Sequence, residues 1–514
     1  MSVTAGRARA RPDRGIVGGM RAIPRLATVL LLSALAAVAG GCAGAPVAAP
    51  ADTPVDAPVA APVPLPPLFD DLERRTFDYF RETTNPRNGL VPDRFPTPSF
   101  ASIAAVGFGL TAYGVGVENG WITRDEGIAR TLATLRFFDT APQGPAARGT
   151  SGHHGFFYHF LDMETGERFG TTELSTVDTT LLLGGVLFAQ SYYDRDDPRE
   201  AEIRMLAERI YGRVDWPSMQ VRGELVSMGW HPESGHIAYD WVGYNEAMLV
   251  YLLALGSPTH PVASTAWDAW TRTYDEAWGE YRGREHLGFA PLFGHQYSHV
   301  WVDFRGIRDA YMRGRGIDYF ENSRRAALSQ RDYAIANPMG WKGYGADVWG
   351  LTASDGPADV VREVDGVARE FKSYTARGAG ARHAFDDGTI VPTAALGSLP
   401  FAPAEVVAAA AAMRARYPHA NGRYGFLDAF NPTFDFADVP LKHGRLVPGA
   451  GWVDTDWLGI DQGPIVLMIA NHRNGFVWDV MKRNPHLRRG LRRAGFEGGW
   501  LDAGPGGEPV PAGD

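Results

Sequence analysis

The residues best suited to chemistry lie between Met228 and Gly350, where eight of the fourteen tryptophans occur among Tyr, His, Asp and Glu. A typical run is Asp240-Trp-Val-Gly-Tyr-Asn-Glu-Ala-Met248. Aromatic rings offer flat apolar faces to a pyranose, and carboxylates transfer protons and accept hydrogen bonds from sugar hydroxyls. The pattern is therefore typical of a carbohydrate site. A place in the core is the alternative for any single tryptophan, although a core does not favour interleaved charges.

Several acidic side chains stand where a polar loop turns into an apolar helix. They are Asp178, Glu246, Asp454 and Asp461. Ser175 is placed to cap the helix that carries Asp178, and Asn245 to cap a helix that begins at Glu246. Pro464 is expected to begin a third helix, with Asp461 just outside it. If these helices run in the same direction within one ring, their N-termini meet and the acids converge.

Each of these acids also has a purely structural interpretation, because a carboxylate at a helix start is stabilised by the helix dipole by about 0.3 to 1 kcal/mol. Capping and catalysis both stay open for Asp178. Glu246 has no capping-box partner and is flanked by Trp241 and Tyr244, which favours catalysis or substrate contact. Burial raises the pKa of such a carboxyl, as a general acid requires, whereas a helix N-terminus lowers it.

The elements that must position these acids are mostly helical. Apolar residues recur with helical spacing over 68–83, 102–118, 125–138, 176–193, 199–214, 245–255, 261–278, 304–313, 319–336, 403–416, 463–471 and 475–482. Two short hairpins are expected, over 155–162 and 225–239. The pattern predicts an all-α fold, an (alpha/alpha)6 toroid of alternating inner and outer helices with long loops and a few short hairpins. Long connections of this kind favour a functional face.

The N-terminal segment predicts export. Arg21 and Arg25 precede the apolar run 26–38, which ends in a sequence that resembles a lipobox at Cys42. The predicted organisation is a lipoprotein signal peptide (1–41), an Ala/Pro-rich tether (42–67), a catalytic domain (68–501) and a disordered tail (502–514). The protein is thus expected in the bacterial cell envelope, lipid-anchored through Cys42 and facing the periplasm. An ordinary secretory signal is the alternative.

Composition and motifs argue against several other classes. A net charge of -9 argues against a basic surface that would bind nucleic acid. Serine-hydrolase, P-loop and zinc-protease motifs are missing, and a single cysteine permits neither a disulfide within the chain nor a cysteine-pair metal site. His153, His154 and His159 are close in sequence and could bind a metal, but a loop cluster that hydrogen-bonds backbone or sugar is favoured. We therefore expect no metal and no cofactor.

Several longer motifs carry a resemblance to a known family. They are 101–110, 155–162, 173–179, 240–248, 256–261, 293–299, 337–344, 425–430 and 459–464. In this order they resemble the bacterial glycoamylase-like family that includes the endo-beta-1,2-glucanases of glycoside hydrolase family 144. The resemblance covers nearly the whole of the predicted domain.

The resemblance implies an (alpha/alpha)6 toroid that binds beta-1,2-glucan and hydrolyses it with inversion, giving short oligosaccharides without a metal. By the matching motifs, Glu246 is the candidate general acid, Asp454 or Asp461 the candidate base, and Asp178 the competing acid. The candidate sugar contacts are Glu173, Trp241, Tyr244, His295, Trp341, Tyr344 and Trp349. The alternatives are an exo-acting or transglycosylating enzyme on the same glucan, and a non-catalytic glycan-binding lipoprotein.

Overall fold

Side-chain caps begin several of the helices. The computed structural model describes residues 64–381 and 384–503. Ser102 accepts a hydrogen bond from the amide of Ala105 at the start of α2 (Ile103–Glu118), and Ser175 accepts one from Asp178 at the start of α4 (Thr176–Tyr192). Asp318 caps α11 (Tyr319–Ala336) in the same way. These caps satisfy backbone donors that a helix start leaves unpaired.

The remaining helices are α1 (Leu68–Thr83), α3 (Arg124–Thr140), α5 (Pro198–Gly212), α6 (Met248–Gly256), α7 (Thr265–Thr271), α8 (Tyr274–Ala277), α9 (Tyr297–Trp301), α10 (Ala310–Arg315), α12 (Pro392–Leu396), α13 (Pro403–Arg416), α14 (Gly459–Asn474), α15 (Phe476–Met481), α16 (Pro485–Arg493) and α17 (Gly499–Asp502). Single 3-10 turns are η1 (Trp216–Met219), η2 (Leu292–His295) and η3 (Pro418–Ala420).

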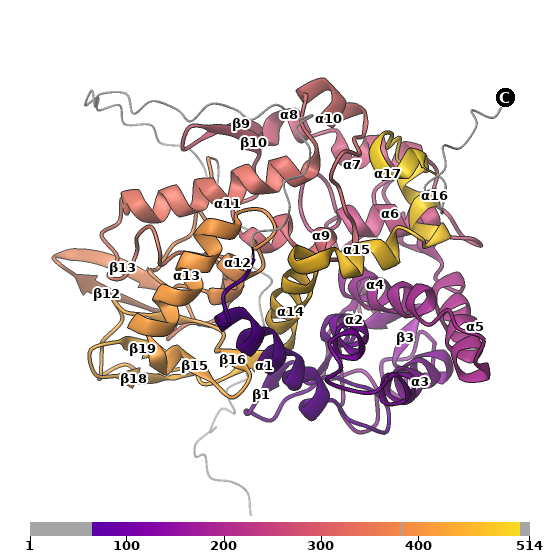
Figure 1. Cartoon of the computed structure of the whole chain (residues 1–514), viewed down its shortest axis with the longest axis horizontal. Coiled ribbons are helices and arrows are strands. Elements are labelled where there is room, and N and C mark those ends of the chain that lie inside the picture. The colour runs from indigo at the N-terminus through magenta and orange to yellow at the C-terminus, as the bar shows by residue number, and fades with distance from the viewer. Residues whose placement is uncertain (1–63, 382–383, 504–514) are drawn as a thin grey trace, which may run out of the picture. The chain divides into compact units, whose positions relative to one another are not determined.

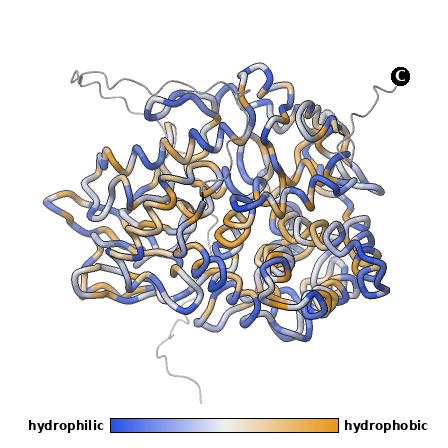
Figure 2. The backbone as a smooth tube through the Cα atoms, in the orientation of Figure 1, coloured by the Kyte–Doolittle hydropathy of each residue, from blue (hydrophilic) through white to orange (hydrophobic). Residues whose placement is uncertain are grey.

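The apolar helices α2, α4, α6, α9, α12 and α14 pack against one another. Helix α2 contacts α4 and α14, α4 also contacts α6 and α9, and α14 contacts α9 and α12. Gly107 of α2 and Gly185 of α4 permit the closest approach, since an added Cβ would lie 2.1 Å from a backbone oxygen of the facing helix. Helices α1, α3, α5, α13 and α16 each pack against a member of this group (Figure 1). The apolar residues of α2 and α14 are visible in Figure 2.

Hydrogen bonds link further pairs of these helices. The amide of Leu249 in α6 donates to Ser298 Oγ in α9. Gln296, directly before α9, donates from its side-chain amide to the carbonyl of Ala394 in α12 and to Ser398. Together with the packing contacts, these bonds connect α2, α4, α6, α9, α12 and α14 in sequence and return to α2.

The strands are short. They are β1 (Arg94–Phe95), β2 (Ala101–Ser102), β3 (Gly152–His153), β4 (Phe156–Tyr158), β5 (Phe160–Leu161), β6 (Leu174–Ser175), β7 (Gly229–His231), β8 (Gly235–His236), β9 (Trp278–Tyr281), β10 (Arg284–Leu287), β11 (Ala353–Ser354), β12 (Val360–Val364), β13 (Val367–Phe371), β14 (Thr375–Ala376), β15 (Asn421–Gly422), β16 (Gly425–Phe426), β17 (Phe430–Asn431), β18 (Arg445–Val447), β19 (Gly451–Val453) and β20 (Trp457–Leu458). The largest sheet has the order β3-β4-β6-β7-β8 and positions the residues that precede α4.

The mostly helical prediction is confirmed, and three predicted helices, 68–83, 319–336 and 403–416, have the observed bounds. The hairpin predicted over 225–239 is β7-β8. The single helix predicted over 261–278 is wrong, because the chain forms α7, α8 and the first residue of β9 there. Helices α9, α12 and α16 were not predicted, since short buried helices carry too few turns to show a period.

Two predicted helix starts also need correction. Helix α6 begins at Met248, so Glu246 lies in the preceding turn and is not a helical residue. Helix α14 begins at Gly459, so Asp461 lies in its first turn, and Pro464 is inside the helix. Pro464 is the sixth residue of α14, so it removes the amide that would otherwise donate to the carbonyl of Ile460.

The predicted domain boundaries stay a prediction. All described residues belong to one compact unit, Thr53–Asp514. The signal peptide, Cys42, most of the tether and nearly all of the tail lie outside the described residues. Within 64–381 and 384–503, no helix combines the length and apolarity needed to cross a bilayer.

Candidate active site

Glu246 occupies a buried turn directly before α6. Its carbonyl accepts a hydrogen bond from the Ser298 hydroxyl, and the neighbouring Asn245 side chain accepts one from the amide of Ala247. The Glu246 Oε2 atom is buried and has no hydrogen-bond partner among the described residues. Burial raises the pKa of the Glu246 carboxyl to about 7, and the charge of Asp178 adds to this effect. Burial therefore raises the pKa of Glu246 by more than the helix N-terminus lowers it, and the carboxyl can hold a proton near neutral pH.

Asp178 is held by a serine and a histidine. Ser175 donates its hydroxyl to Asp178 Oδ2, and His159 Nε2 lies 3.4 Å from Asp178 Oδ1. The other ring nitrogen of His159 lies 2.8 Å from Glu173 Oε1. Burial by itself lowers the pKa of His159, but the charges of Asp178 and Glu173 outweigh it and raise that pKa to about 9. His159 is thus an imidazolium ion at neutral pH.

A second group of acids, the aspartate cluster, consists of Asp355, Asp428, Asp454 and Asp461. Carboxylate oxygens of Asp355, Asp428 and Asp454 lie within 4.8 Å of one another. The amide of Asp355 donates to Asp428 Oδ2 at 2.7 Å. Arg94 donates to Asp355 Oδ2 at 2.5 Å and supplies a positive charge to this group.

The members of the aspartate cluster differ in proton affinity. Burial raises the pKa of Asp454 and of Asp428 well above the ordinary value. Burial also raises the pKa of Asp461, to about 7, while its hydrogen bond with Asp428 opposes this rise. Because two carboxylates can form that bond only if one is protonated, Asp428 and Asp461 share a proton and the pair keeps one negative charge. Asp454 is fully buried.

Tyr297 connects the two groups of acids. Burial raises the pKa of its hydroxyl well above the ordinary value, and the charges of Asp461, Glu246 and Asp178 contribute. All three carboxyl groups therefore lie within range of one tyrosine. Tyr374, whose exposed fraction is 56%, lies near Asp461, so the site borders the surface. The convergence of Asp178, Glu246 and Asp461 is the arrangement expected from the sequence.

The aspartate cluster has the donor set of a cation site, since Asp355, Asp428 and Asp454 could each offer an oxygen. Arg94 already provides the balancing charge at Asp355. His159 contacts carboxylates, whereas His153 stacks against His154 and Trp230. His159 therefore differs in its contacts from His153 and His154, and the absence of a histidine metal site stays a prediction.

Most of the predicted sugar contacts are buried. Trp241, Tyr244, His295, Trp341 and Trp349 all have exposed fractions of 9% or less. Trp341 and Tyr344 donate hydrogen bonds to Asp386 and brace a loop. Trp349 has an exposed fraction of 1%, which favours the core interpretation for this residue. It stays a prediction that these aromatic residues and the half-buried Glu173 contact the substrate.

Several site residues were not selected from the sequence. They are Arg94, Asp355, Asp428, Tyr297 and Tyr374. Two of them lie in motifs that carried the family resemblance, namely Tyr297 in 293–299 and Asp428 in 425–430. Treating every ionisable or hydroxyl side chain of those motifs as a candidate would have found them. Arg94 and Asp355 lie outside the motifs and carry no such signal.

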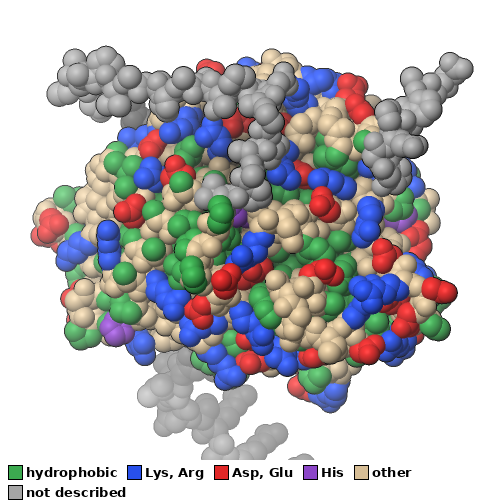
Figure 3. All heavy atoms as spheres, in the orientation of Figure 1, with side chains coloured by type: hydrophobic (Ala, Val, Ile, Leu, Met, Phe, Trp, Pro, Cys, Tyr) green, Lys and Arg blue, Asp and Glu red, His purple; other side chains and the backbone are tan. Residues whose placement is uncertain are grey.

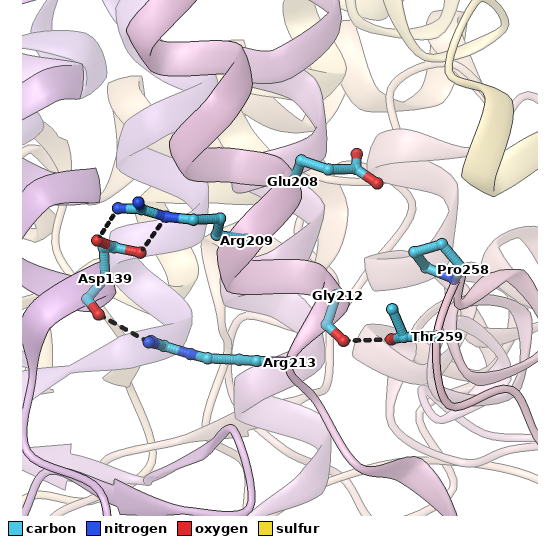
Figure 4. A pocket seen from close by; sticks show the side chains of 7 residues that line it. All are labelled: Asp139, Glu208, Arg209, Gly212, Arg213, Pro258 and Thr259. Carbon is cyan, nitrogen blue, oxygen red and sulfur yellow. Dashed lines mark hydrogen bonds and ion pairs between the residues drawn. The ribbon is translucent and has the colours of Figure 1, made fainter.

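A hollow of about 550 Å³ lies elsewhere on the molecule (Figure 4). It is lined by Asp139, Glu208, Arg209, Gly212, Arg213, Pro258 and Thr259. Arg209 pairs with Asp139, and Arg213 donates to the Asp139 carbonyl. Pro258 and Thr259 follow the C-terminal end of α6, whereas Glu246 precedes its N-terminus. Its two carboxylates are paired, Asp139 with Arg209 and Glu208 with His486, so this hollow lacks the proton-holding carboxyl of the acid site.

A glycoside hydrolase uses one carboxyl with a raised pKa as the acid and a second carboxyl that can accept a proton, and Glu246 and the Asp428–Asp461 pair offer these groups. Comparison with known proteins agrees. The glycoamylase family model, described as "Putative glucoamylase", matches residues 238–485. A crystal structure described as a "putative glucoamylase" from Bacteroides uniformis is 31% identical, with a TM-score of 0.70, and the match covers 84% of this chain and 98% of that one. The chain belongs to the glycoamylase family of glycoside hydrolases.

Two further relatives have more specific descriptions. An endo-beta-1,2-glucanase from Chitinophaga pinensis, solved with sophorotriose and glucose, is 27% identical with a TM-score of 0.71, over 84% of this chain and 98% of that one. An exo beta-1,2-glucooligosaccharide sophorohydrolase (non-reducing end) from Parabacteroides distasonis is 28% identical over 462 residues, which is 83% of this chain. The match spans 57% of the length of that curated relative.

Proposed function

We propose that this protein hydrolyses beta-1,2-linked glucan, cutting internally and with inversion, to give short beta-1,2-gluco-oligosaccharides. The observation that carries the proposal is the Glu246 carboxyl, whose pKa is raised to about 7 and whose Oε2 atom is buried without a hydrogen-bond partner among the described residues. The Asp428–Asp461 pair supplies a second carboxyl group. The similarity to the glucanase from Chitinophaga pinensis supports the choice of glucan.

In this mechanism Glu246 is the general acid. Its proton moves to the glycosidic oxygen as the bond from that oxygen to C1 breaks, and a water molecule forms the new bond to C1 from the opposite face. Asp461, as the ionised partner of Asp428, accepts the proton of that water. Asp454 is the weaker candidate for base, because its fully buried carboxyl has no access to water. Asp178 then keeps the proton on Glu246 by its nearby charge.

We also propose that the helices form an (alpha/alpha)6 toroid. The succession of contacts through α2, α4, α6, α9, α12 and α14, and the packing of α1, α3, α5, α13 and α16 outside them, support this arrangement. The acids lie before or in the first turns of three inner helices, α4, α6 and α14. Such a ring gathers the N-termini of its inner helices at one end, which accounts for the convergence of the acids.

The test is incubation of the purified protein with linear beta-1,2-glucan, followed by measurement of new reducing ends. Glu246→Gln should abolish turnover and leave glucan affinity largely unchanged. Glu363→Gln, on the exposed β12 strand, is the matched control and should retain full activity. Near-normal turnover by Glu246→Gln would remove this residue from the mechanism, and glucan binding without any product by the wild type would favour a non-catalytic glycan-binding protein.

Exo-action is the second candidate, and the similarity to the sophorohydrolase from Parabacteroides distasonis favours it. The product pattern over time separates the two modes. Internal cutting shortens the polymer rapidly and gives mixed oligosaccharides, whereas exo-action releases disaccharide from the first minutes. Redistributed chain lengths with an unchanged number of reducing ends would identify transglycosylation.

We further propose that Cys42 is lipidated and anchors the enzyme to a membrane of the cell envelope, facing the periplasm. The proposal rests on the apolar run 26–38 and the lipobox-like sequence at Cys42. Expression of the full chain and of Cys42→Ala, followed by fractionation, tests it. The wild-type protein should be found with the membranes and Cys42→Ala in the soluble fraction, and equal distribution would refute the anchor.

A further inference from the structure

Three phenylalanines form a stack beside the candidate active site. The rings of Phe100 and Phe160 have centroids 4.1 Å apart, and the rings of Phe100 and Phe169 have centroids 4.7 Å apart. Phe169 is 41% exposed, and Phe100 and Phe160 are half-buried. Within the described residues, Phe100 and Phe160 pack in this stack rather than against the main apolar core. We call this group the phenylalanine platform.

The platform is continuous with the acids. The ring of His159 stacks on that of Phe160, with centroids 3.9 Å apart and an angle of 26° between the planes. The same His159 ring hydrogen-bonds Glu173 and lies 3.4 Å from Asp178. Asp178 in turn acts on the proton affinity of Glu246. A line of contacts therefore runs from the exposed ring of Phe169 to Asp178, whose charge acts on the candidate general acid.

The backbone holds the platform in place. Strands β2 and β5 pair through Ser102 and Phe160, directly beside Phe100. The amide of Phe169 donates to the carbonyl of Phe160 at 3.0 Å. Arg168, next along the chain, has a side chain only 1% exposed and donates to the carbonyl of Thr172, which closes the loop around Phe169. A surface fixed in this way binds with little loss of conformational entropy.

We propose that the phenylalanine platform is a binding subsite for glucosyl units of the glucan that extend beyond the bond being cleaved. The inference rests on the proposed function for the identity of the sugar. A cluster of rings with one partly exposed member offers apolar surface to the C–H face of a pyranose. The continuity with His159 and Glu173 places that pyranose on the same chain as the reacting unit. The platform would thus make the enzyme prefer long chains over short oligosaccharides.

The test compares Phe169→Ala with the wild type on a long beta-1,2-glucan and on the shortest oligosaccharide that the wild type cleaves. We expect kcat/KM on the long chain to fall about five- to tenfold and kcat/KM on the short substrate to stay within about twofold. Phe169→Trp, which restores a flat ring, should recover most of the loss. Met205→Ala removes another exposed apolar side chain, on α5, and should change neither rate.

Equal losses on both substrates, or no loss on the long chain, would overturn the inference. A second measurement tests the platform separately from the proposed function. Calorimetry compares the affinity for long glucan of Glu246→Gln with that of the double variant Glu246→Gln/Phe169→Ala. If the wild type does not cleave glucan but loss of the Phe169 ring weakens glucan binding, the platform proposal is supported and the proposed hydrolase function is refuted. If the wild type cleaves glucan and Phe169→Ala changes neither affinity nor rate, the hydrolase function is supported and the platform proposal is refuted. A wild type that neither binds nor cleaves beta-1,2-glucan would refute both proposals.

Discussion

Replacement of Glu246 by glutamine should make the protein less active and, at alkaline pH, more stable relative to the wild type. The wild-type carboxyl has an ordinary pKa of 4.5 when unfolded and about 7 when folded. The folded state therefore binds more protons between these values, and its stability falls as the pH rises through them. The loss of unfolding free energy caused by ionising Glu246 in the folded protein is absent below pH about 4.5 and complete above pH about 7.

The size of the effect follows from the same pKa difference. A rise from 4.5 to about 7 corresponds to about 3 kcal/mol of unfolding free energy. Glutamine does not titrate, so the stability of the variant relative to the wild type should increase by about 3 kcal/mol between pH 4 and pH 8. The buried Oε2 position has no hydrogen-bond partner, so burying a glutamine amide there lowers the stability of the variant by an amount that does not depend on pH. This amount cancels when the two pH values are compared.

The assay is urea unfolding of both proteins at pH 4 and pH 8, with Glu363→Gln as the control that should follow the wild type. Turnover measured on the same samples should fall by about 10² to 10⁴ for Glu246→Gln, the usual contribution of a general acid. In the wild type, kcat/KM should decline above pH about 7, because Glu246 must be protonated to act. A stability difference that does not change with pH would refute the buried, proton-holding role of Glu246.

The remaining predictions concern the second acid group, the histidine and a buried ion pair. Asp461→Asn should lower kcat by about 10² to 10⁴, whereas Asp454→Asn, which changes a fully buried group without access to water, should cost less than tenfold. Equal losses in steady-state assays would contradict the choice of base. His159 has a folded pKa of about 9, so it stabilises the protein fully below pH about 6.5 and loses this effect as the pH rises through 9. Urea unfolding should show that the advantage of the wild type over His159→Gln shrinks by about 2 to 3 kcal/mol between pH 6 and pH 10, and a constant advantage would argue against the imidazolium. Arg377→Met leaves the fully buried carboxylate of Asp387 unpaired and should cost about 3 to 5 kcal/mol of unfolding free energy, and a loss under 1 kcal/mol would refute the importance of that pair.

Local sequence patterns sufficed for much of the fold. The long helices at 68–83, 319–336 and 403–416 were predicted with their observed ends, because several turns of apolar period and a clear cap or proline define such helices. Short helices such as α9 and α12 were missed, since five residues cannot display a helical period. The β12-β13 hairpin was missed as well, although its residues alternate between half-buried and exposed along β12.

The sequence by itself determined which residues could do chemistry: Glu246, Asp178 and Asp461 stand out because their types and neighbours are local properties. Only the tertiary structure decided which of them hold protons. The pKa of a carboxyl depends on how completely water is removed and on charges from distant parts of the chain, such as Asp428 beside Asp461 and His159 beside Asp178. Arg94 and Asp355 are 261 positions apart along the chain and meet only because helices and loops from both halves pack together. Long-range contacts of this kind leave no trace in local periodicity, so the electrostatics of the site had to come from the fold.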